Sequence, residues 1–323
     1  MTFFYNFESF DITPLVEQYT GKKIEDLFLN HEVISNEMGQ FMRILFQEEF
    51  LQRNINLRLS KKKLLHNLKT VYYIGEYTEQ KLLKKGVKTL YDLRLNLKYR
   101  TSAKEILDLI DNKKFNRLCK NRYINDLDVL FCFNLEDLLF LDIETIGIYD
   151  SPIIILGIGF FRNSQFEINI FFARDLGEEI AIFEHFKSKI LPYFKVFVTY
   201  NGKSFDIPYI GNRFLYYYDE NPMISEEDSP YEKSNTKYHH IDLYHNCRRK
   251  FKGMFEDYTL TNIEQKILGF RRKNELPSSL VGLCYKMYLD DPVRYVGVIK
   301  EVIEHNYWDI YAMPLILQKL LEE

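Results

Sequence analysis

A short stretch of the sequence, residues 138–147, limits most strongly what this chain can fold into. It reads LLFLDIETIG: apolar residues, then Asp142 and Glu144 one residue apart, and a stop at Gly147. A short apolar run bounded by a glycine is typical of a buried strand. Because residues i and i+2 of a strand point to the same face, we expect the two carboxylates to lie side by side.

Two neighbouring carboxylates at the end of a buried strand have two interpretations. Their burial is costly unless a cation lies between them, and carboxylate oxygens are hard ligands that favour Mg²⁺ or Mn²⁺ over zinc. Alternatively, the strand leaves the core here and the acids merely begin the following turn, because Asp-x-Glu is a common pattern. Further motifs elsewhere in the chain have to decide between them.

Composition narrows the class of protein. The chain has 323 residues and a mass of 38.9 kDa, enough for two domains and a substantial core. Hydrophobic residues make up 46% and charged residues 28%, which is typical of a globular protein. The net charge of −3 does not by itself indicate a polyanionic partner, so only a local patch of basic residues could indicate one.

Cellular location is predicted from the cysteines and the apolar runs. The four cysteines form no Cys-x-x-Cys pair, which argues against a zinc site or a disulfide framework and favours a reducing compartment. The N-terminus lacks the features of a signal peptide, and the most apolar run, Pro152–Phe161, is too short to span a bilayer. We therefore expect a cytoplasmic protein without membrane contact.

Residues 1–125 are predicted to form a smaller, mostly helical N-terminal region. Residues 39–50 (GQFMRILFQEEF) place apolar side chains at roughly helical spacing. Farther on, Gly86 is expected to end one short helix and Thr89 to cap the next, which begins at Leu90. The turn at Ile74 and Gly75 leaves backbone N–H groups at a helix N-terminus, where a phosphate can bind.

The segment near residues 69–97 resembles the helix-hairpin-helix module, which grips the nucleic-acid backbone without reading its sequence. The family hairpin has two glycines around one apolar residue; Gly75 is present here, and Tyr77 stands where the second is expected. Basic residues surround the segment, and acids are sparse, so positive charge is local. The alternative is an ordinary solvated lysine face. The residues predicted to contact nucleic acid here are Gly75, Lys81, Lys84 and Lys85.

From residue 126 to residue 323 the pattern changes to strands alternating with helices, which indicates an α/β layer. Strands are expected at 138–144, 152–161, 165–172 and 195–200, with a helix over 178–193. Residues 219–238 are predicted to be a surface loop. We expect a short strand leading into a helix at 239–244, and a capping box at Thr261–Glu264 for a helix ending at Gly269.

Two further acidic positions follow in this half. The strand over 195–200 ends at Asn201, and Ser204 is expected to cap a helix that contains Asp206, an acid that the helix dipole alone also favours. Near the C-terminus, His305 and Asp309 are four residues apart and share one helical face. His305 alone is typical of packing, but beside Asp309 it becomes a candidate general base next to a metal ligand.

Taken in order, these acidic motifs resemble those of the DEDD exonucleases, 3′→5′ exonucleases on the ribonuclease H-like fold. Their combination with a helix-hairpin-helix resembles the YprB-type ribonuclease H-like proteins, where stretches like 261–269 and His305-Asn306-x-x-Asp309 recur. In DEDD enzymes histidine usually stands five residues before the last aspartate, and tyrosine four. His305 therefore has the tyrosine spacing.

The resemblance implies a ribonuclease H-like mixed sheet flanked by helices, and a two-metal phosphodiesterase acting on single-stranded DNA or RNA. Two Mg²⁺ or Mn²⁺ ions would be held by Asp142, Glu144, Asp206 and Asp309, with His305 deprotonating water. Asn201 and Thr145 are expected to contact or position the substrate strand. Two other functions remain open: a structure-specific endonuclease with the same metal site, and a catalytically silent nucleic-acid-binding protein.

Overall fold

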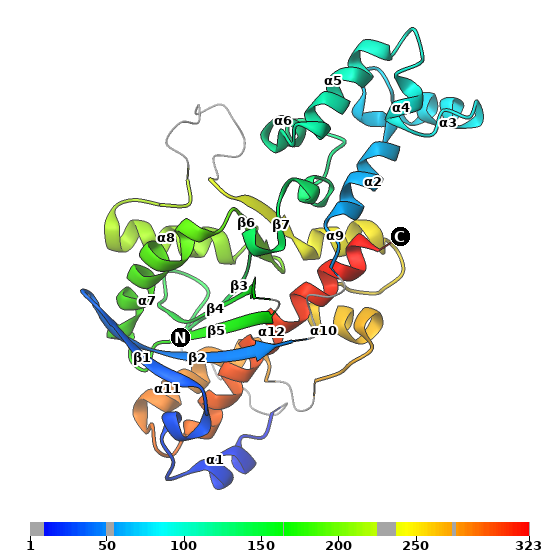
Figure 1. The fold of residues 1–323 in the computed structure, drawn as a ribbon. Coiled ribbons are helices and arrows are strands. Elements are labelled where there is room, and N and C mark those ends of the chain that lie inside the picture. Colours follow the sequence, from blue (N-terminus) through cyan, green and yellow to red (C-terminus); the bar gives the residue numbers. More distant parts are fainter. Residues whose placement is uncertain (1–9, 50–54, 164, 225–236, 273–275, 323) are drawn as a thin grey trace. The chain divides into compact units, whose positions relative to one another are not determined.

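The chain divides into two compact units, shown in a computed structural model that describes residues 10–49, 55–163, 165–224, 237–272 and 276–322 (Figure 1). One unit comprises Met1–Arg53 and Glu136–Leu317, and the other comprises Asn54–Leu135 and Gln318–Glu323. The first contains a seven-stranded sheet, and the second is helical. Of the predicted loop 219–238, residues 225–236 lie outside the described residues.

The sheet is mixed and has the strand order β1-β2-β5-β4-β3-β6-β7. The strands from β1 to β3 in this order pair antiparallel, whereas β3, β6 and β7 pair parallel. The strands are β1 (His31–Asn36), β2 (Gly39–Glu48), β3 (Leu138–Thr145), β4 (Ile153–Arg162), β5 (Gln165–Phe172), β6 (Val196–Thr199) and β7 (His239–Asp242). The strands expected after residue 126 are confirmed, as is the ribonuclease H-like mixed sheet flanked by helices.

Helices surround the sheet and build the second unit. Those of the first unit are α1 (Thr13–Tyr19), α7 (Glu179–His185), α8 (Asp206–Tyr218), α9 (Leu243–Lys250), α10 (Leu260–Ile263), α11 (Val281–Asp290) and α12 (Val296–Leu321), whose last residues are grouped with the second unit. Those of the second are α2 (Arg58–His66), α3 (Glu76–Lys84), α4 (Leu90–Leu93), α5 (Arg100–Asp111) and α6 (Phe115–Cys119). Among the described residues, no helix is both long and apolar enough to cross a membrane.

The helix predicted over Gly39–Phe50 is wrong. Gly39–Glu48 is strand β2, which pairs with β1 on one side and with β5 on the other. Its neighbouring residues Phe41 and Met42 are both fully buried, so both faces of the strand are covered. A strand covered on both faces loses the apolar–polar alternation and mimics helical spacing. Residues 31–48 therefore belong to the sheet and not to the helical region in which the sequence placed them.

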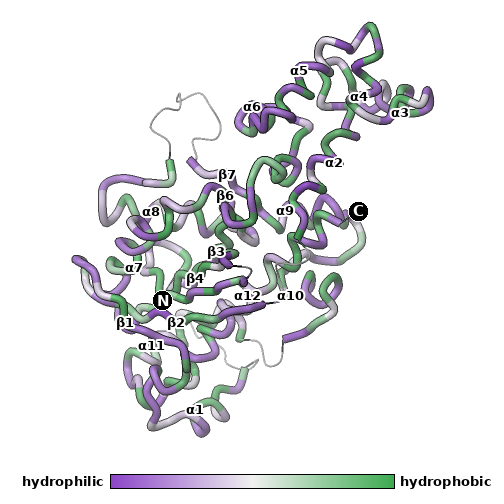
Figure 2. The backbone as a smooth tube through the Cα atoms, in the orientation of Figure 1, coloured by the Kyte–Doolittle hydropathy of each residue, from purple (hydrophilic) through white to green (hydrophobic). Residues whose placement is uncertain are grey.

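The two faces of β3 have different partners. Leu139, Leu141 and Ile143 pack into one buried cluster with residues of α7 and α8. Asp142 and Glu144 alternate with them and face α12, as their contacts with that helix show. The central strands are largely hydrophobic along the tube in Figure 2. The strand alternation therefore separates the apolar face from a carboxylate face within one strand.

Two glycines of β4 let α12 approach the sheet closely. A Cβ atom on Gly157 would lie 1.9 Å from Oδ1 of Asn306, and one on Gly159 would lie 2.6 Å from Cγ2 of Ile310. Gly157 is directly opposite Asp142 across the β3–β4 pair. Glycine in a strand interior often marks such a close approach of another element.

The second unit has its own core and confirms the predicted helix ends. Leu64, Leu82, Leu90 and Leu107 belong to one buried cluster of this unit. Helix α3 ends just before Gly86, which has a φ of +85°. Thr89 caps α4: its Oγ1 accepts a hydrogen bond from the backbone N–H of Asp92 at 3.2 Å.

Candidate functional site: a buried carboxylate centre

The carboxylate centre is built first from β3. Glu144 is 8% exposed, and Asp142 is half-buried on the same face of the strand. Oδ2 of Asp142 accepts a hydrogen bond from Nδ2 of Asn306 at 2.8 Å. The backbone N–H of Ile143, between the two acids, donates a hydrogen bond to Oδ1 of Asp206 at 3.1 Å. One strand thus carries two acids and orients a third.

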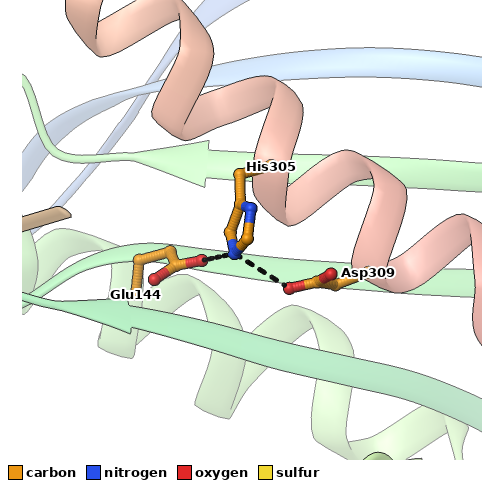
Figure 3. A group of neighbouring side chains, drawn as sticks. All are labelled: Glu144, His305 and Asp309. Atoms are coloured by element: carbon orange, nitrogen blue, oxygen red, sulfur yellow. Dashed lines mark ion pairs between the residues drawn. The ribbon is translucent and has the colours of Figure 1, made fainter. Parts of the chain in front are cut away.

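Helix α12 supplies the histidine and the last acid. His305 and Asp309 are one turn apart, and both project from α12 towards Glu144 on β3 (Figure 3). Nε2 of His305 lies 3.9 Å from Oε1 of Glu144 and 3.5 Å from Oδ2 of Asp309. Ligand atoms of these three residues all lie within 4.8 Å of one another. The helical spacing predicted from the sequence therefore places both side chains in one cluster.

Asp206 enters the centre as the first residue of α8. It is buried, and the preceding residue, Phe205, caps the helix without a side-chain hydrogen bond. The expectation that Ser204 caps this helix is wrong, because Ser204 lies in the turn before it and donates its N–H to the carbonyl of Asn201 at 3.1 Å. Asp206 is thus held by Ile143 of β3.

Burial governs the protonation of these acids. It raises the pKa of Asp142 and of Glu144 well above their ordinary values, and the nearby charges of Asp309 and Asp206 raise both further. Burial also raises the pKa of Asp206 to about 7. Carboxyls that repel one another in a buried site lose less when a cation joins them. The centre is therefore electrostatically suited to a cation.

The donor set fits a divalent metal ion. Oxygen atoms of Glu144 and Asp309 and a nitrogen of His305 lie within reach of one ion, and carboxylate oxygens are the ligands that Mg²⁺ and Mn²⁺ prefer. Among the described residues, Oδ1 of Asn306 and Nδ1 of His305 are buried without a hydrogen-bond partner. Such atoms are few in folded proteins, and two of the four among the described residues lie at this centre.

Three structural features of the site were not anticipated from the sequence. Asn306 contacts Asp142, and buried Asp242 holds the turn after β6 by accepting from the N–H groups of Asn201 at 3.0 Å and Lys203 at 3.1 Å. Arg272 contacts Asp309 at 2.6 Å. Each contact joins residues far apart in the sequence, so no local sequence pattern predicts it. Asn306, within the repeated His305-Asn306-x-x-Asp309 stretch, is the one with a sequence signal.

The expected capping box at Thr261–Glu264 is also wrong. Thr259 precedes α10 and makes no side-chain cap, while Glu264 is fully buried and pairs with Arg272. The helical segment does end at Gly269, with a φ of +77°. An acid three residues after a threonine gives the same sequence pattern whether its side chain bonds to the backbone of the cap residue or is buried in the interior.

The remaining predicted residues lie outside the carboxylate cluster. Asn201 is exposed and adopts a φ of +65° in the turn after β6. Thr145, at the end of β3, donates its Oγ1 hydrogen to the carbonyl of Gly147 at 2.7 Å. The four residues expected to contact nucleic acid outside the sheet domain belong to the second unit: Gly75, Lys81, Lys84 and Lys85.

Comparison with known proteins places this site in a family. The family model of the RNase_H superfamily matches residues 139–321, which include every residue of the carboxylate centre. The chain therefore belongs to the RNase_H superfamily, and this membership favours nuclease-type chemistry on nucleic acid. The chain is also 27% identical over 184 residues to the uncharacterized protein YprB of Bacillus subtilis (strain 168). The match covers 56% of this chain and 41% of that protein.

Proposed function

We propose that this protein is a metal-dependent 3′→5′ exonuclease that hydrolyses phosphodiester bonds of single-stranded DNA or RNA. The observation that carries the proposal is the convergence of four carboxylates and a histidine from three elements onto one buried centre. These residues are Asp142, Glu144, Asp206, Asp309 and His305. Family membership supports nuclease chemistry, and the order of the motifs along the chain supports the exonuclease type.

The metal ligands in this proposal are the four acids. Asp142, Glu144, Asp206 and Asp309 would hold two Mg²⁺ or Mn²⁺ ions, which when bound lower the pKa of a water and stabilise charge on the phosphoryl group. Asn306 orients Asp142 through a hydrogen bond of 2.8 Å, and the Ile143 amide orients Asp206 through one of 3.1 Å. The protein thereby fixes its ligands by contacts outside the centre, as metal sites require.

His305 is the proposed general base. Its Nε2 faces the acids, which places it to accept the proton of the attacking water. The same nitrogen lies 3.3 Å from Oγ of Ser278, a second polar group beside it. Glu144 is proposed to contact both metal and terminal nucleotide, and Asn201 and Thr145 to position the strand.

The second unit is proposed to guide the strand as a helix-hairpin-helix. Buried Ile74 lies between Tyr73 and Gly75, and Tyr73 has a φ of +68°, a left-handed conformation that favours glycine. Tyr73 and Gly75 thus flank one apolar residue as the two glycines of such a hairpin do, with Tyr73 at the first position, whereas Tyr77 lies within α3. The exposed tyrosines 72, 73 and 77 offer surfaces on which bases can stack.

The lysines of α3 give this surface its charge. Lys81 and Lys84 lie in the last turn of α3, and Lys85 follows it. Within the described residues these three lysines have no ion pair, so their charge is available to a phosphate backbone.

We also propose that the protein acts in the cytoplasm.

The test is cleavage of 5′-labelled single-stranded DNA and RNA oligonucleotides with Mg²⁺, Mn²⁺ or EDTA. We expect a metal-dependent ladder that shortens from the 3′ end and is lost in Asp142→Ala. Glu256→Ala, which removes an exposed carboxylate, serves as the matched control and should cleave normally.

Other results would contradict this function in distinct ways. Discrete internal cuts, or cleavage of a circular substrate, would indicate an endonuclease with the same centre. Tight binding without cleavage under any metal would indicate a catalytically silent nucleic-acid-binding protein. Normal cleavage by Asp142→Ala would show that the carboxylate centre does not catalyse the reaction.

A further inference from the structure

Arg272 brings a buried positive charge to the carboxylate centre. Its side chain is 4% exposed, and its Nη2 lies 2.6 Å from Oδ1 of Asp309. Its Nε donates to Oε2 of Glu264 at 2.9 Å, and its Nη2 also pairs with Oε1 of that glutamate. A guanidinium held by two carboxylates in this way has little freedom to move.

Glu264 anchors this arginine from outside the centre. It is fully buried in the helical turn Glu264–Leu268 that follows α10, while Asp309 belongs to α12. Nη1 of Arg272 also lies 3.5 Å from the carbonyl oxygen of His305, one turn before Asp309 on the same helix. The Glu264–Arg272 pair therefore holds α12 at the two residues that face Glu144.

The contact divides the two oxygens of Asp309 between different partners. Oδ1 faces Arg272, whereas Oδ2 lies 3.5 Å from Nε2 of His305 on the side of Glu144. Asp309 therefore presents Oδ2 to the centre, while Arg272 holds Oδ1. A carboxylate fixed in this way keeps its orientation whether or not a cation is present.

Charge balance gives the arginine a second role. Four carboxylates approach one another in the centre, and their ionised forms need a compensating charge. The buried guanidinium of Arg272 lies 2.6 Å from Oδ1 of Asp309 and so brings a positive charge to the edge of this group of acids. The same residue thus fixes Asp309 and places a compensating positive charge beside the acids of the centre.

We propose that Arg272, anchored by Glu264, is a positioning residue for Asp309 and a built-in counter-charge that keeps the carboxylate centre assembled before a metal ion binds. The part of this inference that concerns the metal rests on the proposed function. The competing interpretation is a purely structural ion pair that joins the turn after α10 to α12.

Thermal unfolding of the full chain in EDTA and in saturating Mn²⁺ separates the two interpretations. Arg272→Met should lower the melting temperature in EDTA by roughly 6 to 20 °C, because it leaves buried carboxylates without a partner. Mn²⁺ should recover at least half of this loss, since the cation replaces the missing charge. Arg272→Lys, which keeps the charge but not the fork, should lose less than half as much.

Arg213→Met is the matched control. Arg213 is a buried arginine paired with the buried Glu179, and among the described residues it contacts none of the four acids of the centre. This variant should lose the same stability in EDTA and in Mn²⁺. If Arg272→Met behaves as Arg213→Met does, or if it is as stable as the wild type, the proposal is overturned.

A double-mutant cycle tests the pairing without metal. In EDTA, Arg272→Met combined with Asp309→Asn should lower the melting temperature by less than the sum of the single effects, by at least a third. Additive effects would overturn the positioning role. If Mn²⁺ raises the melting temperature of neither wild type nor variant, the metal centre of the proposed function fails, and this cycle alone decides the role of Arg272.

Discussion

Replacing Gly157 by alanine tests how the sheet and α12 build the site together. Gly157 belongs to β4 and pairs with Asp142 of β3. The side chain of Asn306 on α12 packs against it. An added Cβ would lie 1.9 Å from Oδ1, 2.9 Å from Cγ and 3.2 Å from Nδ2 of Asn306. Because real Cβ atoms do not approach so closely, Asn306 has to move, and its 2.8 Å hydrogen bond to Asp142 has to lengthen or break.

The expected cost has two parts. Overpacking a close-packed interior typically costs about 1–3 kcal/mol. Loss of the hydrogen bond between Asp142 and the buried Asn306 adds roughly 1–3 kcal/mol, because the Asn306 amide stays buried without this partner. We therefore expect Gly157→Ala to lower the free energy of unfolding by about 2–6 kcal/mol and to reduce metal-dependent cleavage.

A second substitution makes this reasoning testable. Asn306→Ala removes the atoms that the new Cβ meets, so the double variant should be less destabilised than the sum of the two single variants by about 1–2 kcal/mol. Gly159→Ala is the matched control, because its Cβ would meet Phe166 and Ile310 and not Asn306. It should destabilise the protein without being relieved by Asn306→Ala.

Chemical denaturation of the wild type, the three single variants and the two double variants, followed by circular dichroism, measures these values. Gly157→Ala within about 0.5 kcal/mol of the wild type would refute the close approach of α12 to the sheet. Equal relief of Gly157→Ala and Gly159→Ala by Asn306→Ala would refute the specific contact between Gly157 and Asn306.

Three further predictions concern pH, the proposed base and the second unit. In EDTA the free energy of unfolding should fall between about pH 4 and pH 7, because burial raises the pKa of Asp206 from 3.8 to about 7. The folded protein then keeps a proton that the unfolded chain has released; the loss is on the order of 4 kcal/mol, and Mn²⁺ should reduce it in denaturation titrations at each pH. His305→Gln should slow cleavage in single-turnover assays by about 10²–10⁴-fold while unfolding within a few degrees of the wild type. Replacing Lys81, Lys84 and Lys85 together by glutamine should lower the slope of log affinity against log salt for a single-stranded oligonucleotide by about two, measured by fluorescence anisotropy; an unchanged slope would remove these lysines from the contact.

The elements that carry the acids could be predicted because their signals are local. The run before Asp142, the glycine after a helix at Gly86 and the threonine cap at Thr89 all depend on neighbours within a few residues. The spacing of His305 and Asp309 fixed their common helical face in the same way. Local geometry is enough to place such residues on their elements.

The contacts that assemble the site could not be predicted because they join distant parts of the chain. Strand β2 belongs to the sheet only through its pairing with β5, more than a hundred residues later. Glu264 looks like a capping residue until Arg272 is placed against it. Gly157 has no assignable role until Asn306 lies above it. Tertiary contacts override local preference in each case.

Mn²⁺ binding to the carboxylate centre is the most direct test of the account. Isothermal titration calorimetry of the full chain, compared with the isosteric variant Asp142→Asn/Asp309→Asn, measures it without requiring a substrate. We predict that the wild type binds Mn²⁺ and that the variant, folded by circular dichroism, binds at least ten-fold more weakly. Equal Mn²⁺ binding by the two proteins would contradict a metal centre built from these carboxylates.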